Sequence, residues 1–116
     1  MVINMKKHNI VKNNYEFNSI IRNGKSKKNK YFIIYYANNV LEKYRFGISV
    51  GKKIGNAVIR NRYKRKIRSI VDNNKKYYQK NIDYIIIMRK ACIDASFIEM
   101  ENKYIVLIKD IQKEEN

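Results

Sequence analysis

Apolar residues recur every three or four positions in three stretches of the chain, which is the spacing of an amphipathic helix. The first stretch begins at Asn14, which we expect to be its N-cap, and ends before Gly24, which we expect at the C′ position. A basic loop, Lys25–Lys30, is expected to follow it. The apolar positions of this helix are Phe17, Ile20 and Ile21.

The second helical stretch is preceded by Gly55 and by Asn56, a candidate N-cap, and is predicted to end at about Asn73. At about 100° per residue, one of its faces is apolar and the opposite face is polar and basic. The apolar stripe comprises Ile59, Tyr63, Ile67, Ile70 and Val71, and the opposite face carries Asn61, Lys64, Arg65 and Arg68. We expect the stripe to pack on a core and the basic face to remain exposed.

The charge of this second helix is unusual because the stretch from Gly51 to Val71 contains no acidic residue, and the first one is Asp72. Like charges four residues apart destabilise a helix by roughly 0.2–0.5 kcal/mol per pair. A helix that carries such pairs repeatedly is suited to binding a polyanion. The alternative is a solvated charged face, although such faces usually mix charges of both signs.

A third helix is predicted to begin near Ser96, because Ser96 and Glu99 have the spacing of a capping box. Its apolar face comprises Phe97, Met100, Tyr104, Leu107, Ile108 and Ile111.

Three other stretches have the patterns of β-strands. Tyr31–Ala37 is rich in aromatic and β-branched residues, and Tyr44–Val50 alternates between apolar and polar positions. We expect these two strands to form a hairpin. Asp83–Met88 is a continuous apolar run, which is typical of a strand covered on both faces.

The predicted order of elements is therefore α-β-β-α-β-α in a single α+β domain over residues 1–116. We expect two layers, a small mixed sheet with helices packed on it, and a loose segment over residues 1–13.

The composition indicates what this domain binds. Its formal net charge is +16, from 26 Lys and Arg against 10 Asp and Glu, which predicts association with nucleic acid or another anionic surface. No apolar run approaches the roughly 20 residues of a membrane span, so no membrane partner is expected. The single cysteine, Cys92, cannot form an internal disulfide; we expect it to be a buried core residue in a cytoplasmic protein.

The chain lacks the residues of a self-sufficient catalyst. With one histidine, His8, and one cysteine, it can form neither a catalytic histidine pair nor a zinc site. Its acidic residues also lack the spacing of a magnesium site.

The segment from Lys52 to Arg68, KKIGNAVIRNRYKRKIR, closely resembles the signature of the protein subunit of bacterial ribonuclease P. Shorter similarities extend over most of the chain, at Tyr15–Phe17, Arg22–Ser26, Arg45–Val50, Asp83–Lys90 and Ala95–Phe97. The resemblance implies a fold like that of the second domain of ribosomal protein S5. That fold has a left-handed βαβ crossover, against the usual right-handed rule.

The resemblance also implies a function in which RNA is the catalyst. The catalytic RNA removes the 5′ leader of precursor tRNA with Mg²⁺, which the RNA uses. The protein binds that RNA, one protein per RNA, and contacts the leader of the precursor tRNA. It needs no catalytic residue of its own and no protein partner, and the resemblance assigns no protein-bound metal site.

Individual roles follow from the same resemblance. The RNA subunit is expected to contact Lys52, Lys53, Arg60, Asn61, Arg62, Lys64, Arg65 and Arg68. The single-stranded leader is expected to contact Phe17, Ile21, Tyr35, Arg60 and Asn61, with Ile21 where the family often has an aromatic residue. Further phosphate contacts are expected from Arg45, Arg89 and Lys90. For Phe17 and Tyr35, a purely structural core position is the alternative.

Two other functions stay open on the sequence alone. One is a general RNA-binding protein of the ribosomal type with no role in cleavage. The other is a nuclease that cleaves RNA without an RNA subunit.

Overall fold

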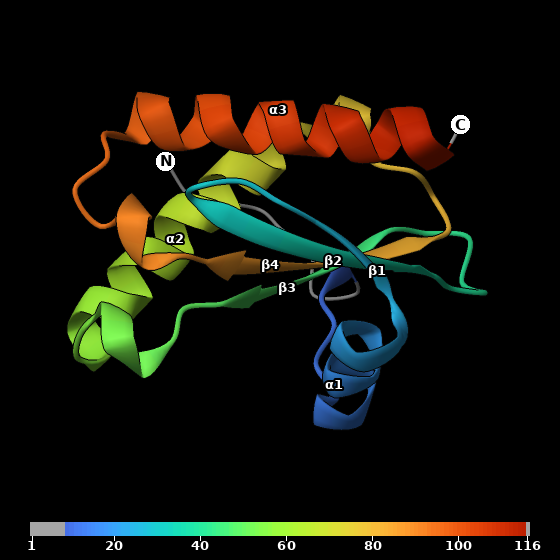
Figure 1. Cartoon of the computed structure of the whole chain (residues 1–116). Coiled ribbons are helices and arrows are strands. Elements are labelled where there is room, and N and C mark those ends of the chain that lie inside the picture. The colour runs from blue at the N-terminus through green and yellow to red at the C-terminus, as the bar shows by residue number, and fades with distance from the viewer. Residues whose placement is uncertain (1–8, 116) are drawn as a thin grey trace.

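The computed structural model describes residues 9–115 of the chain, which form three helices and a four-stranded sheet (Figure 1). His8 and most of the segment predicted to be loose lie outside the described residues. The helices are α1 (Asn14–Asn23), α2 (Ala57–Asn73) and α3 (Phe97–Glu115). The strands are β1 (Lys25–Lys28), β2 (Phe32–Asn38), β3 (Arg45–Ser49) and β4 (Ile82–Met88).

The sheet has the order β1-β2-β4-β3, so the last strand of the chain lies between two earlier ones. β4 is antiparallel to β2 and parallel to β3, and α2 connects the two parallel strands. The predicted hairpin of β2 with β3 is therefore wrong. β4 is buried at every position except Ile87, and the central place gives this apolar strand neighbours on both edges. The left hand implied for the β3–α2–β4 crossover stays a prediction.

The predicted loop after α1 is also wrong, because Lys25–Lys28 forms β1 and pairs antiparallel with β2. The turn between the two strands is closed by Asn29, whose side-chain oxygen accepts hydrogen bonds from the backbone amides of Tyr31 and Phe32. Lys25 and Lys27 form ion pairs with Glu115 and Glu114 of α3, at 3.2 and 2.8 Å. Lysines are common on edge strands, because they discourage pairing with other chains, and this explains why a strand carries a loop-like sequence.

The start of α1 differs by one residue from the prediction. Asn13, not Asn14, is the N-cap, and its side-chain oxygen accepts hydrogen bonds from the amides of Tyr15 and Glu16. At the other end, Gly24 has ordinary backbone angles, with φ of −79°. A glycine is needed there for space, because a Cβ would lie 2.7 Å from the carbonyl oxygen of Tyr36.

The predicted ends of the other two helices are confirmed. Asn56 caps α2 by accepting a hydrogen bond from the amide of Ile59. Ser96 and Glu99 form the expected capping box, since each side chain accepts a hydrogen bond from the other residue's backbone amide.

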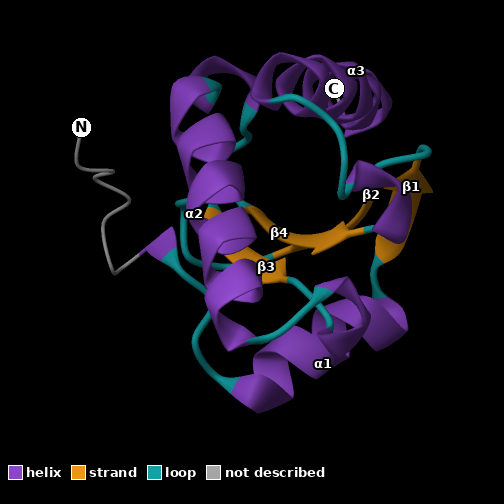
Figure 2. Cartoon of the chain, turned by 90° about the vertical axis from the view of Figure 1, so that its left-hand side faces the viewer, coloured by secondary structure: helices purple, strands orange, loops and turns teal. Residues whose placement is uncertain are grey.

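Helices α2 and α3 cover one face of the sheet and enclose the main core (Figures 1 and 2). The apolar stripes predicted for α2 and α3 are buried except at Ile59, which is partly buried, and at Phe97, which is 37% exposed. Cys92 is fully buried as predicted, and burial raises the pKa of its thiol to about 11. None of the helices in residues 9–115 is long and apolar enough to cross a membrane.

The opposite face of the sheet is covered only in part, by α1 and by the segment before it. Val11 is buried there, and its amide donates a hydrogen bond to the carbonyl oxygen of Phe46 on β3. Residues 9–11 are thus fixed to the sheet, although they were predicted to be loose. α1 adds a partial third layer to the two predicted ones.

Candidate nucleic-acid interface

The basic face of α2 is exposed, as its amphipathic pattern predicts. Arg62, Arg65 and Arg68 are exposed, and Arg60, Lys64 and Lys66 are partly buried. Within residues 9–115, none of these six cations forms an ion pair with an acidic side chain. Their charge is therefore available to an external anion. Arg60 also has a buried Nε without a hydrogen-bond partner among the described residues.

Lys52 and Lys53 extend this charge beyond the start of the helix. They lie in a short 3-10 turn, Lys52–Ile54, between β3 and α2, and both are exposed. The first turn of a helix carries the positive end of its dipole, which also favours anions. Asn61 is exposed in the same helix. The structure thus brings together all eight residues predicted to contact the RNA subunit.

The register of the sheet shows which side chains share the face that α1 covers. Ser26, Tyr35, Ile85 and Gly47 are aligned across the four strands in one row. One row further from α1 are Lys28, Ile33, Ile87 and Ser49. The side chains of Ile33 and Ile87 are only partly buried. We call this second row the open row.

Phe17 of α1 lies directly on Gly47 of β3. A Cβ on Gly47 would lie 2.6 Å from the Phe17 ring, so only glycine lets the ring approach this closely. Phe17, Ile21 and Tyr35 all pack against the small cluster of Val11, Ile20 and Ile85. All three predicted leader-binding side chains of α1 and β2 are therefore on the face that carries the open row, and all three are partly buried.

A small cavity joins this aromatic group to the basic helix. Its volume is about 180 Å³, and it is lined by Phe17 and Gly47 together with Arg68 of α2. Ile10 and Val11 line it as well. Figures 1 and 2 show α1 and the beginning of α2 on the same side of the sheet.

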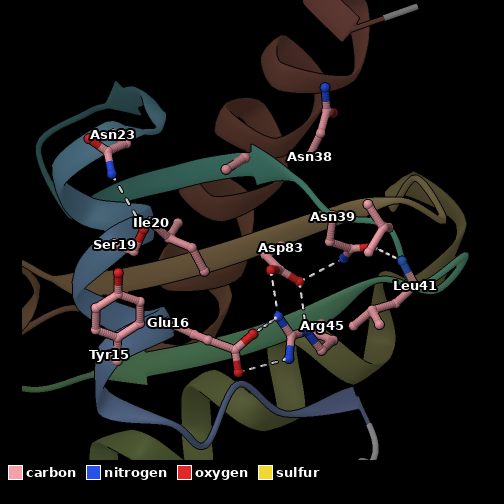
Figure 3. A pocket seen from close by; sticks show the side chains of 12 residues that line it. Tyr15, Glu16, Ser19, Ile20, Asn23, Asn38, Asn39, Leu41, Arg45 and Asp83 are labelled. Carbon is pink, nitrogen blue, oxygen red and sulfur yellow. Dashed lines mark hydrogen bonds and ion pairs between the residues drawn. The ribbon is translucent and has the colours of Figure 1, made fainter.

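Arg45 has a different environment from the one expected for a phosphate contact. Its side chain is 12% exposed, and its guanidinium donates hydrogen bonds to Asp83 of β4 and Glu16 of α1. The hydrogen bonds that Arg45 donates to Asp83, and secondarily those that it donates to Glu16, raise the pKa of Arg45 further above its ordinary value. Figure 3 shows this group at the wall of a second pocket, of about 390 Å³, between α1 and the loop after β2.

The remaining two predicted phosphate contacts are exposed at the end of β4. Arg89 donates a hydrogen bond to the backbone oxygen of Asn29, and Lys90 begins a short 3-10 turn. They follow Ile87 of the open row by two and three residues.

Sequence reasoning missed the open row and the contribution of residues 10 and 11. Ile33 and Ile87 look like ordinary core positions in apolar strands, and only the register of the sheet places them on the less covered face. No signal in the sequence places Ile10 beside Arg68. The described residues contain no group of three His, Cys, Asp or Glu side chains that could hold a metal ion.

Comparison with protein families and relatives gives one consistent result. The family model described as ribonuclease P matches residues 5–112. The ribonuclease P protein component of Mycoplasma capricolum is 43% identical over 109 residues, which cover 93% of this chain and 100% of the relative. The corresponding protein of Bacillus cereus is 38% identical over 110 residues, which cover 94% and 92%.

Solved structures agree with these relatives. A Staphylococcus aureus RNase P protein, a mutant with defective mRNA degradation activity, superposes with a TM-score of 0.85 at 36% identity, covering 93% of this chain and 92% of that one. The RNase P protein of Thermotoga maritima superposes with a TM-score of 0.76 at 33% identity, covering 82% and 90%.

Proposed function

This chain belongs to the ribonuclease P protein family, and we propose that it binds the catalytic RNA of ribonuclease P and the single-stranded 5′ leader of precursor tRNA. In this role it promotes the removal of the leader, the step that forms the 5′ end of tRNA. The observation that carries the proposal is the basic face of α2, whose six cations lack acidic partners among residues 9–115 and adjoin a partly open apolar sheet face.

The basic face is suited to RNA phosphates. An arginine fork can donate two parallel hydrogen bonds to a phosphate, and each neutralised phosphate releases counterions from the RNA. Arg62, Arg65 and Arg68 are exposed on this face, so they are the strongest candidates for contacts with the catalytic RNA. Lys52 and Lys53 would extend the contact beyond the start of α2.

The face of the sheet beside α1 is suited to unpaired bases. Tyr35 and Phe17 are partly buried, so each ring retains surface on which a base can stack, and a stacked base contributes roughly 1–3 kcal/mol. Ile33 and Ile87 supply an apolar floor beside these rings. The phosphates of the same RNA leader can be neutralised by the cations Arg60 and Lys28. Arg89 and Lys90, at the end of β4, can do the same.

Chemistry belongs to the RNA subunit in this proposal. Mg²⁺ held by that RNA would activate the cleaving water, and the protein contributes binding and orientation of the leader. We propose one protein per catalytic RNA, acting in the cytoplasm without another protein partner.

A reconstitution experiment tests the function. Precursor tRNA is incubated at low Mg²⁺ with the protein alone, with the catalytic RNA alone, and with both. We expect cleavage mainly in the mixture. Cleavage by the protein alone would indicate a protein nuclease. Equal cleavage by the RNA alone and by the mixture would indicate a general RNA-binding protein.

Replacing Tyr35 by alanine tests the leader contact. We expect the affinity of the reconstituted enzyme for precursor tRNA to fall about tenfold, because one base loses its aromatic platform. The affinity for mature tRNA, which has no leader, should stay the same. Fluorescence binding titrations of both RNAs measure this difference. An equal loss for both RNAs would show that Tyr35 serves the core instead.

A further inference from the structure

The first turn of α1 contacts β3 through two neighbouring pairs of residues. Glu16 meets Arg45 at 2.9 Å, and Phe17 lies on Gly47. Arg45 and Gly47 are two residues apart on the strand, so both face the same side of the sheet. Consecutive residues of the helix therefore contact consecutive same-face positions of the strand, and a shift of α1 along β3 would break both contacts.

Arg45 is held in place by β4. Its Nε and Nη2 donate hydrogen bonds to the two carboxylate oxygens of Asp83, at 2.9 and 2.8 Å. Asp83 also accepts a hydrogen bond from the side chain of Asn39 at 2.7 Å. A bidentate pair restricts the orientation of a guanidinium group. Arg45 thus presents its remaining hydrogen-bond donors to Glu16 from a fixed position (Figure 3).

The three charged residues differ in how far they support the fold. Arg45 and Asp83 are nearly buried, and removing Arg45 would leave the charge of Asp83 without its ion-pair partner inside the protein. Glu16 has a side chain that is 45% exposed, and without it Arg45 keeps its bidentate partner. Glu16 can therefore be changed without unpairing a buried charge.

We propose that Glu16 and Arg45 are positioning residues for leader binding. Their ion pair fixes α1 in the register that places Phe17 and Ile21 beside the open row, and neither residue contacts RNA. This proposal rests on the proposed function of the same face. It gives Arg45 a role other than the phosphate contact that the resemblance implies.

The sign of the expected effect separates positioning from general electrostatics. Removing an acidic residue from a chain of net charge +16 strengthens its attraction to any polyanion. If Glu16 had only an electrostatic influence, Glu16→Ala would raise the affinity for all RNAs. A positioning role predicts instead that Glu16→Ala lowers the affinity for the leader, because a misplaced Phe17 ring stacks less well on a base.

The test uses full-length Glu16→Ala protein reconstituted with the catalytic RNA. We expect the ratio of affinities for leader-bearing and mature tRNA to fall roughly three- to tenfold, since part of one stacking contact is lost. Affinity for the catalytic RNA should not fall. Glu16→Gln, which keeps the length and an acceptor oxygen for Arg45, should restore most of the ratio.

A second measurement reports the register directly. The α-proton of Gly47 that occupies the Cβ direction faces the Phe17 ring, so the NMR chemical shifts of this glycine depend on the position of that ring. In Glu16→Ala these shifts should move toward ordinary glycine values, while resonances of the α2–α3 core stay in place. Asp110→Ala is the matched control, because it removes one exposed acid from a helix on the other side of the sheet.

Three results would overturn the positioning role. The first is an unchanged affinity ratio with unchanged Gly47 shifts. The second is an equal loss of affinity for leader-bearing tRNA, mature tRNA and the catalytic RNA, which would indicate general damage to the fold. The third is a stronger leader affinity with a salt dependence steeper by about one charge, which would show that Arg45 binds phosphate once Glu16 is gone. If the unaltered chain itself shows no preference for the leader, the proposed function fails instead.

Discussion

Replacing Ile86 by alanine is expected to lower the free energy of unfolding by about 2–5 kcal/mol, the usual cost of truncating a fully buried isoleucine. Ile86 is 0% exposed and lies in the middle of β4, under the helices α2 and α3. The central strand has neighbours on both edges, so the cavity cannot be filled by moving an edge strand. Urea denaturation followed by circular dichroism measures the loss.

The neighbouring residue provides the control. Ile87 belongs to the open row on the other face of β4 and is only partly buried, so Ile87→Ala should cost about 1 kcal/mol. Under the proposed function, Ile87→Ala should instead weaken the binding of leader-bearing precursor tRNA. An equal loss of stability in the two variants would show that both faces of β4 are equally enclosed, and the open row would then not exist.

The double variant Arg62→Ala, Arg65→Ala should bind the catalytic RNA about 10- to 30-fold more weakly at 0.15 M salt. Each lost phosphate contact removes close to one unit from the slope of log affinity against log salt concentration, so the slope should fall by nearly two. Both side chains are exposed and have no ion pair within residues 9–115. Filter binding over a series of salt concentrations measures affinity and slope together.

A charge-matched control separates contact from overall charge. Lys103 and Lys113 are exposed on α3, on the other side of the core from the basic face of α2, and replacing both by alanine also removes two positive charges. This variant should keep the slope of the unaltered protein. If both double variants lose affinity equally, the arginines of α2 contribute only to the overall electrostatic attraction of the protein for RNA and make no specific phosphate contacts.

Local signals explain what the sequence predicts well. The N-cap at Asn56 and the capping box of Ser96 and Glu99 each depend on residues three positions apart, so the boundaries of α2 and α3 follow from neighbouring residues. The buried stripe of α2 follows from helical periodicity in the same way. The exposure of its arginines requires no knowledge of the sheet.

Strand pairing depends on residues far apart, and here the sequence misleads. β2 and β3 are neighbours in the chain but have β4 between them, about 50 residues beyond β2. The composition of Lys25–Lys28 hides a strand, because its lysines are stabilised by acids of α3 at the far end of the chain.

The errors at the candidate site follow from the same cause. Which side chains share the open row depends on the register of β4 with both of its neighbours, and no single strand reveals it. The environment of Arg45 likewise depends on Asp83, which is its partner in the parallel register. A basic residue in a strand of an RNA-binding protein suggests a phosphate contact until its acidic partner is known.

The central position of β4 also constrains the order in which the chain can fold. While the ribosome is still making the protein, β1 and β2 can pair as soon as they emerge, because they are adjacent in sequence. Among the strands of residues 9–115, β3 pairs only with β4, so until β4 has left the ribosome the described contacts leave β3 with a single bridge, from Ile10 to Phe46. During that interval a nascent chain already carries the basic segment of α2 while its sheet is incomplete. Arrival of β4 completes the sheet on both sides at once in a single, long-range event, and α3, which follows β4 in the chain, can then cover the main core.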